Sequence, residues 1–192
     1  MIKSAITVSL VAQAKGGPFV YWDGLEAAAA SAAKLGFDAI EIFAPSAASI
    51  DRPALRALLQ KHGLSAAAFG TGGGWLVHKW HLTPADPAVR QQAREFIRAI
   101  IDVAGEFQAP AIIGSMQGKA EGDVTREQAL AWLAEALTDL GAHAQQYGVP
   151  LLYEPLNRYE TNLLNRQLDA TRFLETRQVG NVKLLCDLFH MN

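Results

Sequence analysis

The sequence predicts an α/β fold with a parallel sheet, and three observations support this. Short apolar runs alternate with helical segments six times along the 192 residues. Neighbouring apolar runs are not joined by hairpin signals, and a helical segment between two strands requires a parallel pair. Half of the residues are apolar and about a fifth are charged, as in one ordinary globular domain. The expected architecture is a barrel or an open doubly wound sheet.

Six strands are expected where Val, Ile, Leu and small residues form short runs. They lie at 5–11, 39–43, 65–69, 111–115, 149–153 and 182–186. The apolar start of the chain weakly resembles a short signal peptide, but it serves equally well as the first strand. Glu41 shares a face of the second strand with Ala39 and Phe43, and it either projects into a barrel interior or, as we favour, is a buried, hydrogen-bonded structural acid.

Five helices fill the intervals, each marked by end signals or by periodicity. They are expected at 24–35, from about 51 to 62, from about 87 to 107, from about 125 to 147, and within 167–176. Asp23 is expected to cap the first helix, and Asp51 and Gly63 bound the second. Thr125 followed by Gln128 predicts a capping box.

The stretch 70–84 is expected to be a long functional loop. Its GTGGG segment lacks the Lys-Ser/Thr of a phosphate-binding loop and no helix is expected directly after it, so we interpret the glycines as spacers of a moving lid. Trp75 and Trp80 are expected to line a substrate pocket, because indole faces suit the apolar C–H surfaces of a ligand. His78 and His81 are interpreted as pocket-lining or solvent-facing residues rather than metal ligands.

The net charge, the length of the apolar runs and the cysteine count of the chain exclude several classes of partner. The formal net charge of −2 and a pI near 6.2 give no electrostatic case for nucleic acid. No apolar run approaches the roughly 20 residues that span a bilayer. The one cysteine, Cys186, excludes an internal disulfide and is expected in the core. We therefore expect a cytoplasmic protein without nucleic-acid or membrane partners.

Two acids follow the last two expected strands. Glu154 comes directly after 149–153, Asp187 directly after 182–186, and His190 three residues later. The carboxyl ends of parallel strands meet at one edge of the sheet, so these side chains should lie together. Two carboxylates beside an imidazole suit a hard divalent cation such as Mg²⁺ or Mn²⁺. The alternative is that each acid forms a structural ion pair or caps a helix.

Five motifs give the chain a family resemblance. It resembles the xylose isomerase-like TIM barrel superfamily, and within it the sugar isomerase/epimerase branch that contains the ketose 3-epimerases. The motifs are GFDAIEI at 36–42, LTPADPAVRQQA at 82–93, IIGSMQG at 112–118, EPLNRYETNLLN at 154–165 and CDLFHMN at 186–192. The last two are specific, and all five stand in the order found in that family.

The resemblance implies a parallel (β/α) TIM barrel with the first six βα units present, so residues 1–192 are expected to form a single barrel domain that is incomplete at its C-terminus. It implies that Glu154 is the catalytic acid/base and a metal ligand, and that Asp187 is a ligand of the same metal. It also implies that Glu160 and His190 bind substrate hydroxyls. The metal would be one Mn²⁺, Mg²⁺ or Co²⁺ ion, and the proteins it resembles are commonly dimers or tetramers. The further ligand and second base of that family come from a seventh and an eighth strand.

The expected function is a metal-dependent sugar or keto-sugar epimerase or isomerase that acts by proton transfer through an enediolate. One alternative is a DNA repair nuclease of the endonuclease IV class, which needs additional histidines after the third and fourth strands. Here those strand ends read Phe69-Gly70 and Gly114-Ser115. The other alternative is a non-catalytic truncated barrel.

Overall fold

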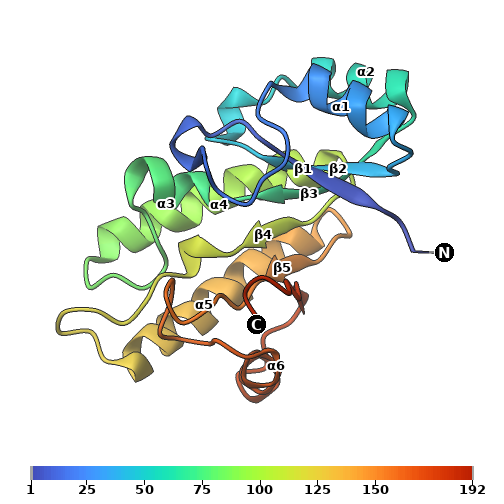
Figure 1. The fold of residues 1–192 in the computed structure, drawn as a ribbon. Helices are drawn as coiled ribbons and strands as arrows, with labels where there is room; N and C mark the ends of the chain where they lie inside the picture. The colour runs from blue at the N-terminus through green and yellow to red at the C-terminus, as the bar shows by residue number, and fades with distance from the viewer. Residues whose placement is uncertain (1, 192) are drawn as a thin grey trace.

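The computed structural model describes residues 2–191 and contains one parallel sheet of six strands in sequential order (Figure 1). The strands are β1 (Ala5–Ser9), β2 (Ala39–Phe43), β3 (Ser65–Gly70), β4 (Ala111–Ile113), β5 (Leu151–Tyr153) and β6 (Val182–Leu184). Each pairs in parallel with the next. The predicted α/β fold with a parallel sheet is thereby confirmed. Met1 and Asn192, the last residue of the CDLFHMN motif, lie outside the described residues.

Helices connect the strands. They are α1 (Leu25–Lys34), α2 (Arg52–His62), α3 (Gly73–His78), α4 (Pro87–Glu106), α5 (Arg126–Gln145) and α6 (Gln167–Thr176), with 3₁₀ turns η1 (Ala12–Ala14), η2 (Ala47–Ser49) and η3 (Ser115–Gln117). The Asp51 carboxylate caps α2, Gly63 ends it at φ 65°, and Thr125 forms the predicted capping box on α5. The predicted cap of α1 is wrong: its N-cap is Gly24, and no side chain bonds the helix start there.

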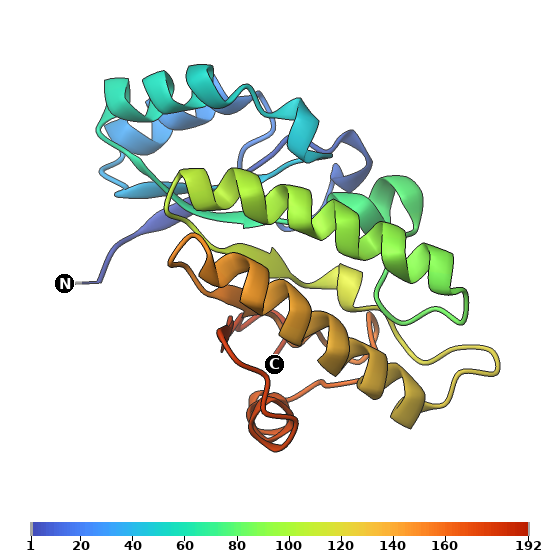
Figure 2. The ribbon, with the colours of Figure 1, turned by 180° about the vertical axis from the view of Figure 1, so that it is seen from behind.

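The helices lie on one face of the sheet, and the view from behind shows α4 and α5 running across it (Figure 2). Side chains that alternate along the strands divide between this covered face and the opposite face. The covered face carries fully buried residues, including Ile40, Ile42, Phe69, Ile113, Leu151 and Tyr153. The opposite face carries Thr7, Glu41 and Ile112, which line a cavity. The core therefore holds the strands in register, while the other face remains available for a site.

The expected loop 70–84 contains the short helix α3, which corrects the sequence interpretation. Its glycines allow close packing. A Cβ on Gly73 would lie 2.5 Å from the carbonyl oxygen of Ala44, and one on Gly74 would lie 2.6 Å from Cε of Met116. Both positions are buried. The glycine cluster therefore lets α3 begin against the ends of β2 and β4, a steric role that local sequence patterns do not report.

Two further expectations concern single features of the chain. Cys186 is exposed rather than part of the core. Within residues 2–191, no helix is both long and apolar enough to cross a membrane.

Candidate metal centre

Glu154 stands at the carboxyl end of β5, and its neighbours hold it there. Its main-chain N–H donates to the Ile113 oxygen at 3.0 Å, which continues the ladder one residue past the strand. A Cβ on Gly114 would lie 2.7 Å from Glu154 Oε2, so the glycine leaves the room that the carboxylate fills. The buried Gln117 amide donates to the main-chain oxygens of Gly114 at 2.9 Å and Glu154 at 3.0 Å, and accepts from the Tyr153 hydroxyl at 2.7 Å. The ends of β4 and β5 are thus tied together at the site.

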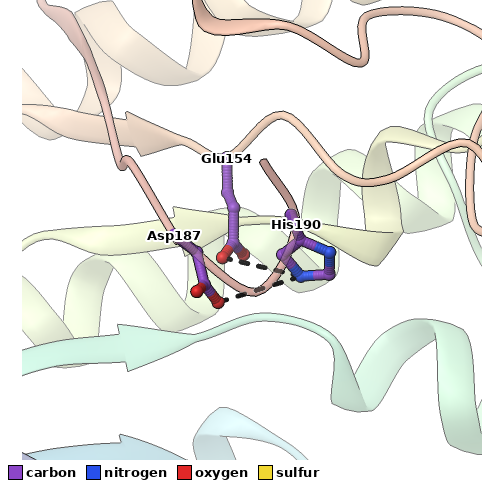
Figure 3. Close-up of side chains that lie close together, drawn as sticks. All are labelled: Glu154, Asp187 and His190. Carbon is purple, nitrogen blue, oxygen red and sulfur yellow. Dashed lines mark ion pairs between the residues drawn. The ribbon is translucent and has the colours of Figure 1, made fainter. Parts of the chain in front are cut away.

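Asp187 and His190 reach the same place from the segment after β6. The Leu185 N–H donates to the Tyr153 oxygen at 2.9 Å, and Asp187 accepts from the main-chain N–H groups of Phe189 and His190 in a tight turn. His190 Nε2 then lies 3.9 Å from Glu154 Oε1 and 4.0 Å from Asp187 Oδ2 (Figure 3). One ligand atom from each of Glu154, Asp187 and His190 can be chosen so that all lie within 4.8 Å of one another. The structure therefore brings the two sequence-predicted carboxylates and the histidine together.

Asn157 determines how His190 faces the acids. Its main-chain N–H and its side-chain amide both donate to His190 Nδ1, at 3.4 and 2.9 Å, and the same amide donates to Glu160 Oε1 at 2.8 Å. Its Oδ1 accepts from the N–H of Tyr159, which fixes the orientation of the amide. Because Nδ1 accepts, the neutral ring carries its proton on Nε2, which points toward Glu154 and Asp187. This arrangement suits His190 as a hydrogen-bond donor better than as a metal ligand, although its distance from the acids would allow either.

The burial and the clustering of carboxylates in the site favour a bound cation. Burial, and then the nearby charges of Asp187, Glu41 and Glu160, raise the pKa of Glu154 to about 8. Burial also raises the pKa of Glu41, opposed by the Thr7 hydroxyl and reinforced by Asp187. Several carboxylates in one partly desolvated cavity are unfavourable unless positive charge compensates them. The oxygen atoms of Glu154 and Asp187 match the ligand preference of Mg²⁺ or Mn²⁺.

The centre opens into a cavity of about 660 Å³, a size that suits a small ligand. Apolar and aromatic walls come from Phe19, Phe43, Trp75, Leu76, Leu156 and Phe189, and Glu41, Glu154, Glu160, Asp187 and His190 add polar groups. Trp75 and Glu160 therefore stand where the sequence placed them, on the pocket. Trp80 does not line it, and instead stacks on His78 at a ring-centroid distance of 4.2 Å.

Four contributors were not predicted as parts of the site: Glu41, Gly114, Gln117 and Asn157. Glu41 accepts a hydrogen bond from the Thr7 hydroxyl at 3.2 Å, as the structural interpretation expected, and it also lines the cavity, where the charge of Asp187 acts on it. Gly114 and Gln117 lie within the IIGSMQG motif, and Asn157 lies within EPLNRYETNLLN, so the motifs marked their segments. Their roles depend on contacts between β4, β5 and the segment after β6, which no local pattern reports.

Comparison with known proteins identifies relatives of this chain. A family model described as "Xylose isomerase-like TIM barrel" matches residues 29–192. An L-ribulose 3-epimerase of Methylomonas sp. (strain DH-1) is 33% identical over 187 residues, which cover 92% of this chain and 63% of that protein. A ketose 3-epimerase of Arthrobacter globiformis is 28% identical over 172 residues, which cover 88% of this chain and 58% of that protein.

The fold is similar to that of a solved epimerase. The crystal structure of D-allulose 3-epimerase from Methylomonas sp. in complex with D-allulose superposes with a TM-score of 0.77 at 29% identity. The match covers 99% of this chain and 64% of that one. The present chain thus spans somewhat less than two thirds of the length of these relatives.

Proposed function

This chain belongs to the xylose isomerase-like TIM barrel family, and from that membership and the geometry of the site we propose that it forms the metal-binding part of a sugar or keto-sugar epimerase. The reaction is proton transfer beside a ketose carbonyl. The substrate class is supported by two relatives, an L-ribulose 3-epimerase and a ketose 3-epimerase. Within this proposal the six βα units belong to one (β/α) barrel domain that assembles as a homo-oligomer.

One observation carries the proposal: Glu154 and Asp187, from neighbouring strands, face each other at the mouth of the cavity with His190 beside them. These two carboxylates would hold a single Mn²⁺, Mg²⁺ or Co²⁺ ion. When bound, the cation supplies Lewis acidity that polarises the ketose carbonyl. The same positive charge lowers the energetic penalty of keeping both acids ionised in a partly buried site.

The protein side chains divide the remaining tasks. Glu154 removes the proton from the carbon beside the carbonyl, and the electrons of that C–H bond pass to the carbonyl oxygen to give an enediolate. The Nε2–H of His190 donates a hydrogen bond to a substrate oxygen, and Glu160 accepts one from a hydroxyl. Trp75 supplies an apolar wall against sugar C–H groups and excludes water. Epimerisation is completed when a second acid on the opposite face of that carbon donates a proton to the enediolate.

The nuclease alternative receives no support from the site. A DNA repair nuclease of the endonuclease IV class carries metal-binding histidines after its third and fourth strands. Here Thr71 and Gly114 directly follow β3 and β4. The group of possible ligands found among residues 2–191 contains His190 as its one histidine.

Mn²⁺ binding and hydrogen exchange test the proposal on the chain itself. We expect one Mn²⁺ per chain by electron paramagnetic resonance. We also expect deuterium from D₂O to enter a ketose such as D-fructose or L-ribulose at the carbon beside the carbonyl. Glu154 alone is enough for this exchange, because it can remove a proton and return a deuteron on the same face of that carbon. Glu154→Gln should abolish both, whereas the exposed control Glu95→Gln should abolish neither. Exchange that persists at the wild-type rate in Glu154→Gln would overturn the assigned role.

A further inference from the structure

A second cavity, of about 250 Å³, adjoins the first. Three residues, Trp75, Ser115 and Glu160, line both cavities. The rest of its lining comes from the segments after β3, β4 and β5, namely His81, Gly118, Lys119 and Tyr159. Because the two cavities share walls, one extended molecule can have its reactive end at Glu154 and its other end in the second cavity.

The walls of the second cavity are fixed by hydrogen bonds between neighbouring segments. Thr161 Oγ1 donates to the Gly118 oxygen at 2.7 Å, and the Asn162 side chain exchanges two bonds of 2.8 Å with the main chain of Ala120. Gly118 has φ 79°, and a Cβ there would lie 2.2 Å from His81 Nδ1. The glycine therefore lets the His81 ring pack against the segment after β4. A cavity with such walls is formed before any ligand arrives.

The two charged residues that line the second cavity, Lys119 and Glu160, are of opposite sign. Lys119 Nζ lies 3.2 Å from Glu121 Oε2, and His81 Nε2 lies 3.6 Å from Glu121 Oε1. His81 is buried, and this burial lowers the pKa of its ring, so the imidazole is neutral near pH 7. Glu160 adds a negative charge on the shared wall. The region has no excess of positive charge, which disfavours a phosphate group.

The remaining groups suit a hydroxylated ring. Trp75 and Tyr159 offer aromatic surfaces, and Tyr159 is 84% exposed, with the Arg158 guanidinium 5.1 Å from its ring centroid. The Lys119 ammonium can donate hydrogen bonds, and the Glu160 carboxylate can accept them. Aromatic faces together with both donors and acceptors match a molecule with apolar C–H faces and many hydroxyls.

We propose that the second cavity is a subsite for a neutral, hydroxylated substituent on the keto-sugar, such as a second sugar ring, so that the preferred substrates are substituted ketoses rather than free or phosphorylated ones. This inference rests on the proposed function, since it takes the reacting end of the sugar to lie at Glu154.

Calorimetric titration of the Mn²⁺-loaded chain tests the subsite. The probes are D-fructose, D-fructose 6-phosphate, and three disaccharides in which a hexose is linked to O4, O5 or O6 of fructose. We expect at least one disaccharide to bind about ten-fold more tightly than D-fructose, equivalent to about 1.4 kcal/mol. D-fructose 6-phosphate should show no such gain.

Two variants of lining residues connect that gain to the second cavity. Lys119→Met and Tyr159→Ala should each reduce the advantage of the disaccharide while leaving the affinities for Mn²⁺ and D-fructose unchanged. The matched control Lys34→Met, at the exposed end of α1, should retain it. Normal D-fructose binding without tighter binding of any disaccharide would overturn the subsite. If D-fructose 6-phosphate bound more tightly than D-fructose and Lys119→Met removed this difference, the proposal that the subsite binds a neutral substituent would be overturned. Failure to bind both Mn²⁺ and D-fructose would instead refute the proposed function, and the subsite with it.

Discussion

Replacing Glu154 with glutamine should stabilise the metal-free chain as the pH rises, and Mn²⁺ should remove this advantage of the variant over wild type. In the metal-free chain, burial and the neighbouring acids raise the pKa of Glu154 from 4.5 to about 8. Below pH 4.5 the carboxyl is protonated in both the folded and the unfolded state, and its preference for the folded state is fully present. As the pH rises from 4.5 to 8, the unfolded chain ionises and the folded chain does not, so the free energy of unfolding falls. Glutamine does not titrate and escapes this loss.

The size of the effect follows from the same two pKa values. Each pH unit between 4.5 and about 8 lowers the free energy of unfolding by about 1.4 kcal/mol. Between pH 5 and pH 9, metal-free wild type should therefore lose on the order of 4 kcal/mol relative to Glu154→Gln. Mn²⁺ at 1,000 times its Kd offsets this loss, because it stabilises wild type by about 4.1 kcal/mol, whereas the variant has lost a ligand and gains less.

Urea unfolding, followed by tryptophan fluorescence at pH 5, 7 and 9, measures both effects. One series contains EDTA and the other contains Mn²⁺. The difference in the free energy of unfolding between wild type and the variant at each pH removes the contribution of groups that titrate equally in both. The control Glu95→Gln reports the effect of losing an exposed carboxylate. Parallel pH profiles of wild type and Glu154→Gln in EDTA would refute the reasoning, because Glu154 would then have the same pKa in both states.

Three further changes test individual contacts. Gly114→Ala places a Cβ 2.7 Å from Glu154 Oε2 and should weaken Mn²⁺ binding at least about ten-fold by calorimetry, and wild-type affinity would contradict the steric argument. Asn157→Asp replaces a donor to His190 Nδ1 with an acceptor, so the proton of the neutral ring should move to Nδ1 in ¹⁵N NMR spectra, and an unchanged tautomer would contradict the assigned network. Thr125→Ala removes the capping box of α5 and should lower the free energy of unfolding by about 1 kcal/mol in urea, without changing Mn²⁺ affinity.

The sequence predicted the features whose causes are local. All five expected helices and all six expected strands occur, because periodicity and end signals act within a few residues. Glu154 and Asp187 could be placed side by side from the sequence, since an acid directly after a buried parallel strand lies at the carboxyl edge of the sheet. The same logic gave the approximate position of His190 in the turn after β6.

What the sequence did not predict depends on contacts between distant segments. The glycines that open α3 read as flexible spacers, yet they are constrained by Ala44 and Met116. Trp75 and Trp80 were indistinguishable by residue type, and only the path of α3 sends one to the cavity and the other onto His78. Asp23 looked like a helix cap, but α1 begins two residues later, beyond the reach of its carboxylate.

The origin of the two acids in β5 and β6 has a consequence for folding. Between Glu154 and Asp187 the chain forms α6, so the two carboxylates meet only after α6 has docked and β6 has added to β5. The cation site is therefore absent from any partly folded form in which β6 is detached, and such a form gains nothing from Mn²⁺. Protection of the Leu185 N–H, which donates to the Tyr153 oxygen, should increase with Mn²⁺ concentration in hydrogen exchange. With the cation bound as proposed, the centre would hold β6 against β5, and metal occupancy would report whether β6 has paired.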